Sequence, residues 1–160
     1  MQDATHKHRE KPTSLDGYLE TMSKVIFTSG INWKVVFAKW EGTRAAFEGF
    51  AVEKVAALTP ADVDRLAEDT RIIRNRKKIE SIIDNAATLI ELDKTPGGFA
   101  GQLASLGDFQ AKADYLKHTF RFMGPSSAHI FLAMTGEPVP ESADCGHYTH
   151  RGGSAGSADC

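Results

Sequence analysis

The chain has 160 residues, 41% hydrophobic and 25% charged, with a formal net charge of −2. This length predicts one domain with a hydrophobic core, and the near-neutral charge excludes a protein that binds polyanions over its whole surface. No apolar run reaches the roughly 18–20 residues that span a bilayer, so we expect no membrane helix and, at this polar N-terminus, no signal peptide. Two cysteines near one end, Cys145 and Cys160, provide no disulfide framework, which favours a cytoplasmic protein.

The composition changes near both ends of the chain. Residues 1–13 are polar and aperiodic, and we expect a tail there. Residues 151–160 are small and rich in glycine and serine, which is typical of a flexible end. We therefore expect the folded domain to occupy residues 14–150.

Between these ends, apolar residues recur at three- and four-residue steps, which predicts helices. Ser14 is placed to cap a first helix that carries Leu15, Leu19 and Met22. Thr59 precedes Pro60, a pairing of N-cap and first helical residue that predicts another helix start.

A long helix is predicted over residues 70–92 because isoleucines and an alanine repeat there at close to 3.5 residues, and 96–98 (Pro-Gly-Gly) should end the segment. Asp108 is expected to cap a helix that runs to Met123, and the last helix should begin near Ser126. We find no alternating strand pattern. The expected fold is all-α, a single compact helical domain of about seven to eight helices.

The most informative stretch is the glycine turn between the last two of these helices. Gly124, Pro125, Ser126 and Ser127 open a helix directly after an apolar segment, and backbone N–H groups at a helix start bind phosphate. Asp144 follows 20 positions after Gly124, where its carboxylate could act on whatever that phosphate positions. The alternative is an ordinary capping or loop aspartate.

Residues 71–78 contain five basic side chains and no acidic one. On a helix with an inward apolar stripe, Arg71, Arg74 and Lys78 would fall on nearby outer positions. This run is either a solvated helix face or a phosphate-binding patch, and charge alone does not decide between the two.

Trp33 and Trp40 are seven residues apart and would share one face of a helix. Aromatic residues at helical spacing usually belong to a core. Because Trp33 follows the break at 28–30 (Thr-Ser-Gly), it could instead line a pocket in which a base stacks.

Histidines and a cysteine gather at the two ends. His6 and His8 lie in the first tail, and Cys145, His147 and His150 lie near the other end. Their number is sufficient for a zinc site, although the spacing matches no finger pattern and a plain loop and tail is the alternative.

Taken together, residues 33–136 resemble the DNA-3-methyladenine glycosylase I family of the helix-hairpin-helix DNA glycosylases. The matching segments are Asn32–Val36, Thr43–Phe50, Val55-Ala56, Asp64–Leu66, Ile72–Ile79, Asn85-Ala86 and Phe120–Gly124. The run Ile-Ile-Arg-x-x-x-Lys-Ile followed by Asn-Ala is fairly specific to that family, whereas many DNA-binding proteins share the hairpin.

The resemblance implies an all-helical enzyme that binds damaged duplex DNA, flips a base out of the stack and hydrolyses its glycosidic bond. It places Trp33 at a base-stacking position, with Phe27 beside it, and Gly124–Ser127 at the phosphate-binding turn. Arg74, Arg76 and Lys77 would hold DNA phosphates. The hydrolysis is expected to be monofunctional, with no cofactor beyond the possible zinc, and the protein to be a monomer.

Three departures from the family pattern bear on this expectation. The family carries a base-reading glutamate eight positions before the tryptophan, and this chain has Val25 there. The family's N-terminal aromatic and zinc-ligand segment is missing, since residues 1–13 contain no Tyr, Trp or Cys. Its C-terminal His-x-x-x-Cys pair is also absent, although Cys145, His147 and His150 could substitute.

Asp144 is a feature of the wider superfamily instead, because most helix-hairpin-helix glycosylases use an aspartate about 20 residues beyond the hairpin glycine. We therefore expect a DNA glycosylase that excises an alkylated purine resembling 3-methyladenine, with Asp144 as its catalytic carboxylate. One alternative is a DNA-damage binding module that has kept the hairpin and lost base excision. Another is a structural helical protein whose basic run is only a solvated face.

Overall fold

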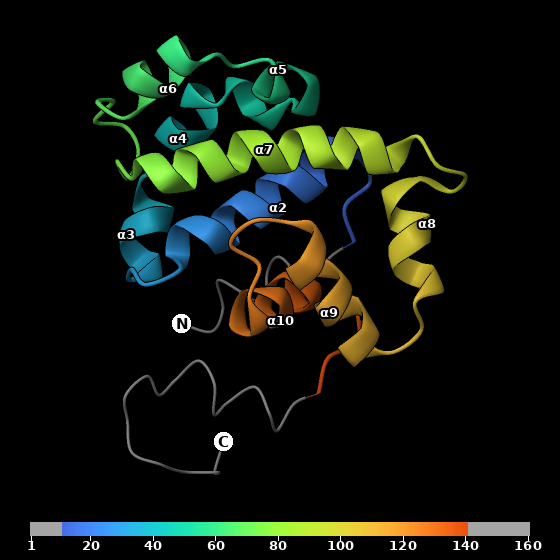
Figure 1. Ribbon diagram of the computed structural model, residues 1–160. Coiled ribbons are helices and arrows are strands. Elements are labelled where there is room, and N and C mark those ends of the chain that lie inside the picture. Colours follow the sequence, from blue (N-terminus) through green and yellow to red (C-terminus); the bar gives the residue numbers. More distant parts are fainter. Residues whose placement is uncertain (1–10, 141–160) are drawn as a thin grey trace.

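The computed structural model describes residues 11–140, and all regular structure within that range is helical, which confirms the all-α prediction. Two helices, α2 and α7, lie across the middle of the molecule, with α4 to α6 on one side and α9 and α10 on the other (Figure 1). Helix α3 lies beside one end of α2, and α8 lies at the opposite end of the molecule. The helices are α2 (Leu15–Thr28), α3 (Trp33–Ala38), α4 (Trp40–Ala46), the 3-10 helix η1 (Glu48–Phe50), α5 (Val52–Ala56), α6 (Pro60–Leu66), α7 (Arg76–Asp93), α8 (Gly98–Ser105), α9 (Phe109–Thr119) and α10 (Pro125–Met134).

The residues predicted from the sequence to cap helices do so in the structure. The Ser14 hydroxyl accepts a hydrogen bond from the Gly17 N–H at 3.1 Å, and the Asp108 carboxylate accepts one from Ala111 at 2.8 Å. Thr59 forms a reciprocal capping box at the start of α6. Each bond satisfies an amide that a helix start would otherwise leave without a partner.

The start of the long helix was predicted about six residues too early. Asp69 accepts hydrogen bonds from both the Arg71 N–H and the Arg71 guanidinium, which folds the chain into a turn at that point. Asn75 then caps α7 by accepting from the Lys78 N–H at 3.1 Å. Residues 71–75 are therefore a loop, because these local side-chain bonds compete with helical ones.

Lys78 is buried, and its expected place on an outer helix face is wrong. Its ammonium donates to the carbonyl oxygens of Phe27, at 3.2 Å, and Ser29, at 2.6 Å. These carbonyls lie at the C-terminal end of α2, where the helix dipole favours a positive charge. Burial lowers the pKa of Lys78. Lys78 thus joins the start of α7 to the end of α2.

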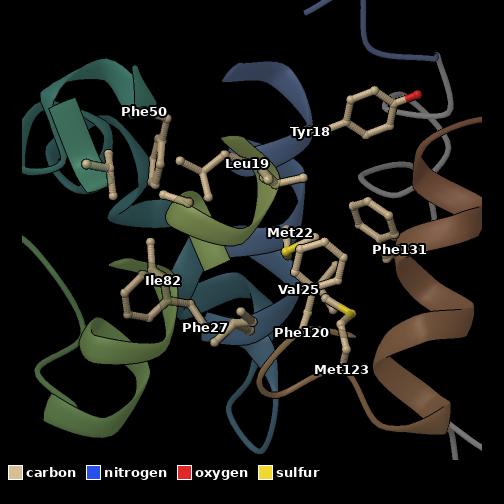
Figure 2. Packing of buried hydrophobic residues seen from close by; sticks show 14 of the residues in the cluster. Tyr18, Leu19, Met22, Val25, Phe27, Phe50, Ile82, Phe120, Met123 and Phe131 are labelled. Carbon is tan, nitrogen blue, oxygen red and sulfur yellow. The ribbon is translucent and has the colours of Figure 1, made fainter. Parts of the chain in front are cut away.

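Aromatic rings dominate the part of the core that α2, α4 and η1 enclose. Phe50 stacks on Trp40 and on Phe47, with ring centroids 5.4 Å apart in both pairs. Phe27 meets Trp40 and Phe47 edge to face. Figure 2 shows Phe27 and Phe50 in this cluster. Such pairs add to the free energy gained from burying apolar area.

We expect Lys78→Met to lower the free energy of unfolding by about 2 kcal/mol, because two buried carbonyls lose a charged donor. The neighbouring exposed Lys77→Met is the matched control and should stay within about 0.5 kcal/mol of the wild type. Urea denaturation of the three proteins measures the difference. Equal midpoints for the two variants would contradict the anchoring role of Lys78.

Candidate nucleic-acid interface

A tight turn over residues 120–124 joins α9 to α10. Phe120 and Met123 are buried and fix the turn to the core, beside Met22 and Val25 of α2 (Figure 2). Between them Phe122 adopts a φ of 60°. The two helices and the turn form the predicted hairpin.

Asn85 of α7 holds this turn by its backbone. Its amide nitrogen donates to the Arg121 carbonyl at 3.1 Å, and its amide oxygen accepts from the Arg121 N–H at 2.9 Å. The Asn85 side chain is buried, and both bonds are partly buried. The Arg121 guanidinium lies on the surface and pairs with Asp84. The sequence signals for this clamp were a polar residue among the apolar ones of this helix and the matching Asn85-Ala86 segment.

Within the described residues 11–140, no side chain caps the start of α10. Gly124 occupies the N-cap position and Pro125 the first helical position, and the Ala128 N–H makes the first helical bond, to the Gly124 carbonyl at 2.8 Å. The Ser126 and Ser127 N–H groups consequently have no acceptor within the helix. Ser126 is exposed. Two amides at the positive end of a ten-residue helix are suited to bind a phosphate.

The basic residues after Arg71 differ in their surroundings. Arg76 pairs with Asp64 at 2.6 Å and lies 3.8 Å from Glu80, and the Asp64 hydrogen bond raises its pKa. Arg74 and Lys77 are exposed, and neither takes part in an ion pair within residues 11–140. Arg74 and Lys77 are therefore available to a DNA phosphate as the chain stands, whereas Arg76 must first leave its acidic partners.

The two tryptophans do not share a helix face, because the chain turns at Lys39 between α3 and α4. Trp40 is buried and donates its indole N–H to Glu20 at 2.9 Å. Trp33 is 37% exposed at the start of α3 and packs against Phe37, with ring centroids 5.5 Å apart. Of the two alternatives drawn from sequence, Trp40 is a core residue and Trp33 presents ring surface to the outside.

Val25 and Phe27, assigned to the base pocket with Trp33, are 2% and 1% exposed. The Phe27 ring is covered by Trp40 and Phe47, so the structure offers no free face of it on which a base could stack. Val25 lies closer to the hairpin, in the cluster with Met123 (Figure 2). A ring covered in this way is part of the core and does not line a base pocket.

The remaining candidate residues lie outside the described residues: Asp144, Cys145, His147, His150, His6 and His8. Among residues 11–140, no group of three His, Cys, Asp or Glu side chains is placed to hold a metal ion. Every helix in that same range is too short or too polar to cross a membrane.

A clamped hairpin whose second helix begins with uncapped amides defines a helix-hairpin-helix protein. The model of the methyladenine glycosylase family matches residues 15–128 of the chain. DNA-3-methyladenine glycosylase 1 of Escherichia coli is 30% identical over 149 residues, which cover 75% of this chain and 80% of that protein. The chain therefore belongs to the methyladenine glycosylase family.

Solved structures support the same assignment. A crystal structure of a 3-methyladenine DNA glycosylase I superposes with a TM-score of 0.74 at 27% identity, covering 84% of this chain and 86% of that one. The Staphylococcus aureus 3-methyladenine DNA glycosylase I, in a structure concerned with 3-methyladenine recognition, has a TM-score of 0.71 at 25% identity over 82% of each chain.

Replacing Asn85 with Ala should lower the free energy of unfolding by about 2 kcal/mol, because Arg121 loses both backbone partners beneath the hairpin. Amide hydrogen exchange at Phe122 and Met123 should accelerate more than exchange in α6, because the clamp acts on the turn.

Asp84→Asn is the matched control, since it removes only the surface pairing with the Arg121 side chain. It should change stability by less than about 1 kcal/mol and leave exchange at the turn unaltered. Exchange at the turn that is unchanged in Asn85→Ala would show that the core alone fixes the hairpin.

Proposed function

We propose that this protein is a monofunctional DNA glycosylase that removes an alkylated purine from duplex DNA by hydrolysing its N-glycosidic bond. The observation that carries the proposal is the clamped hairpin with free amides at Ser126 and Ser127, in a chain that belongs to the methyladenine glycosylase family. The relatives are named for this activity. We infer the same activity for this chain from its family membership and from the hairpin site.

DNA binding begins with phosphates. The amides of Ser126 and Ser127 take one phosphate, and Gly124 and Pro125 shape the turn that presents them. Arg74 lies in the loop before α7, and Lys77 lies in the first turn of α7. Both supply positive charges that attract the phosphate backbone of DNA. These contacts position the duplex without reading its sequence, which suits an enzyme that searches for damage.

The extruded base stacks on Trp33, whose ring is exposed at the start of α3. An N-alkylated purine is cationic, so an indole face attracts it more strongly than it attracts a normal base. Val25 offers neither charge nor hydrogen bond. We therefore infer that selection here depends on stacking and on the weakened glycosidic bond of the lesion, and that the range of alkylated bases accepted is broader than a carboxylate would permit.

The chemistry then needs little acid catalysis, because the cationic base leaves as a neutral molecule. The bond between the sugar C1′ and the base nitrogen breaks, and a water oxygen bonds to C1′ and loses its proton. We assign to the Asp144 carboxylate the stabilisation of the oxocarbenium-like sugar and the orientation of that water. This role rests on the position of Asp144 in the sequence, 20 residues after Gly124.

A second candidate function is a damage-binding module that grips DNA with the same hairpin and does not excise the base. The valine at position 25 favours it, because an interior apolar side chain replaces the family's base-reading group. The two functions predict different products from one lesion-bearing duplex: a free base with an abasic site, or intact DNA.

Base release from methylated duplex DNA, followed by mass spectrometry, decides between these functions. We expect free alkylated purine from the wild type, at least about 100-fold less from Asp144→Asn, and weaker release from Trp33→Ala. Asp159→Asn, in the terminal segment, is the control and should match the wild type. No release at any enzyme concentration, with tight binding of lesion DNA, would establish the binding module.

The salt dependence of duplex binding tests the assignment of the phosphate-binding residues. Arg74→Gln should weaken binding to any sequence and reduce the slope of log K against log salt concentration by about 1, because one phosphate contact is lost. Arg76→Gln should change the slope less, since Asp64 already neutralises this guanidinium. Fluorescence anisotropy between 50 and 200 mM salt measures both, and equal slopes for wild type and Arg74→Gln would remove Arg74 from the interface.

A further inference from the structure

We propose that Phe122 is a DNA-contacting side chain, which packs its ring against the nucleotide next to the phosphate held at the start of α10. The proposal rests on the proposed DNA binding, and goes beyond it by adding an apolar contact to an interface otherwise built from amides and cations. Three observations at the hairpin turn carry it: backbone conformation, exposure and position.

The backbone of Phe122 lies in the left-handed region, with a φ of 60°, which L residues with bulky side chains rarely adopt. Phe50 has nearly the same φ, 59°, and its ring is completely buried between Trp40 and Phe47. Packing therefore explains the conformation of Phe50. Phe122 is 38% exposed, so burial in the core does not explain its conformation in the same way. A glycine would adopt this φ without strain, yet the chain has a phenylalanine here.

The turn holds Phe122 in this exposed position rather than leaving it free to fold inward. Its neighbours on either side are fixed, Arg121 by the Asn85 clamp and Met123 by burial in the core. A ring presented from a fixed backbone loses little conformational freedom when it binds, which favours its use as a contact.

The position of Phe122 points to a nucleic acid as the partner. It lies two residues before Gly124 and four before Ser126, whose amide is free for a phosphate. A nucleic-acid phosphate bound by that amide carries a sugar and a base with it. Aromatic side chains stack on bases of any sequence. The Arg121 side chain beside it is also exposed, but it pairs with Asp84, so the attraction of this turn for a phosphate rests on the amides of α10.

Binding of an undamaged duplex to four variants tests this contact. Phe122→Ala and Phe122→Gly should each bind roughly tenfold more weakly, because the ring is lost. Phe122→Tyr should bind like the wild type, because the ring is kept. The slope of log K against log salt concentration should not change in any of them, which separates Phe122 from Arg74. Val35→Ala, an exposed apolar truncation at another site, is the control.

Thermal unfolding of the same proteins excludes a purely structural role. Glycine is relaxed at a φ of 60°, so Phe122→Gly should unfold at the same temperature as the wild type or a higher one while binding DNA more weakly. If the DNA affinity of the Phe122 variants fell in proportion to their unfolding temperature, the proposed contact would be overturned.

A photo-crosslink locates the ring directly. p-Benzoylphenylalanine at position 122 should crosslink to duplex DNA on irradiation, and the same group at Gln110, at the far end of α9 from the hairpin turn, should not. Wild-type binding with no crosslink at 122 and an unchanged affinity of Phe122→Ala would refute the inference and leave the proposed function intact. Absence of duplex binding by the wild type would overturn both.

Discussion

The pair of hydrogen bonds from Asn85 to the backbone of Arg121 is the constraint on which the site depends. It joins the central helix α7 to a turn that has no regular structure of its own, through a side chain that is itself buried. The free amides of α10 point in a fixed direction because this turn is fixed. The strained conformation of Phe122 persists for the same reason, since the residues around it determine the backbone.

Much of the fold follows from local sequence signals. Ser14, Thr59 and Asp108 begin their helices as predicted, because capping depends on residues within one turn of the cap. The beginning of α7 was missed, since the isoleucine repeat continues back past Asn75 while the Asp69 turn breaks the helix. Periodicity records which side chains are buried, and a buried loop residue such as Ile72 can carry the pattern beyond the helix.

The site was predictable where a motif is local, and unpredictable where partners come from distant segments. The hairpin was found from sequence, whereas a core position and a pocket position were both open for Trp33, which the structure shows to be exposed. The burial of Lys78 and the pairing of Arg76 were not, because carbonyls 49 and 51 residues away hold the first and Asp64 holds the second. A run of five basic residues therefore contains one structural anchor, two cations tied to acidic neighbours and two that make no ion pair within residues 11–140. Charge alone could not reveal this division.

Lys78 and Asn85 are seven residues apart on α7, which corresponds to two helical turns and a rise of about 10 Å. Lys78 holds the chain that leads to Trp33, and Asn85 holds the hairpin. Helix α7 therefore sets the spacing between Trp33, the proposed base-stacking residue, and the proposed phosphate site at the start of α10. A single residue inserted between these two anchors would rotate one by about 100° relative to the other. Over this stretch α7 can vary in the identity of its outward side chains across evolution, but not in its length.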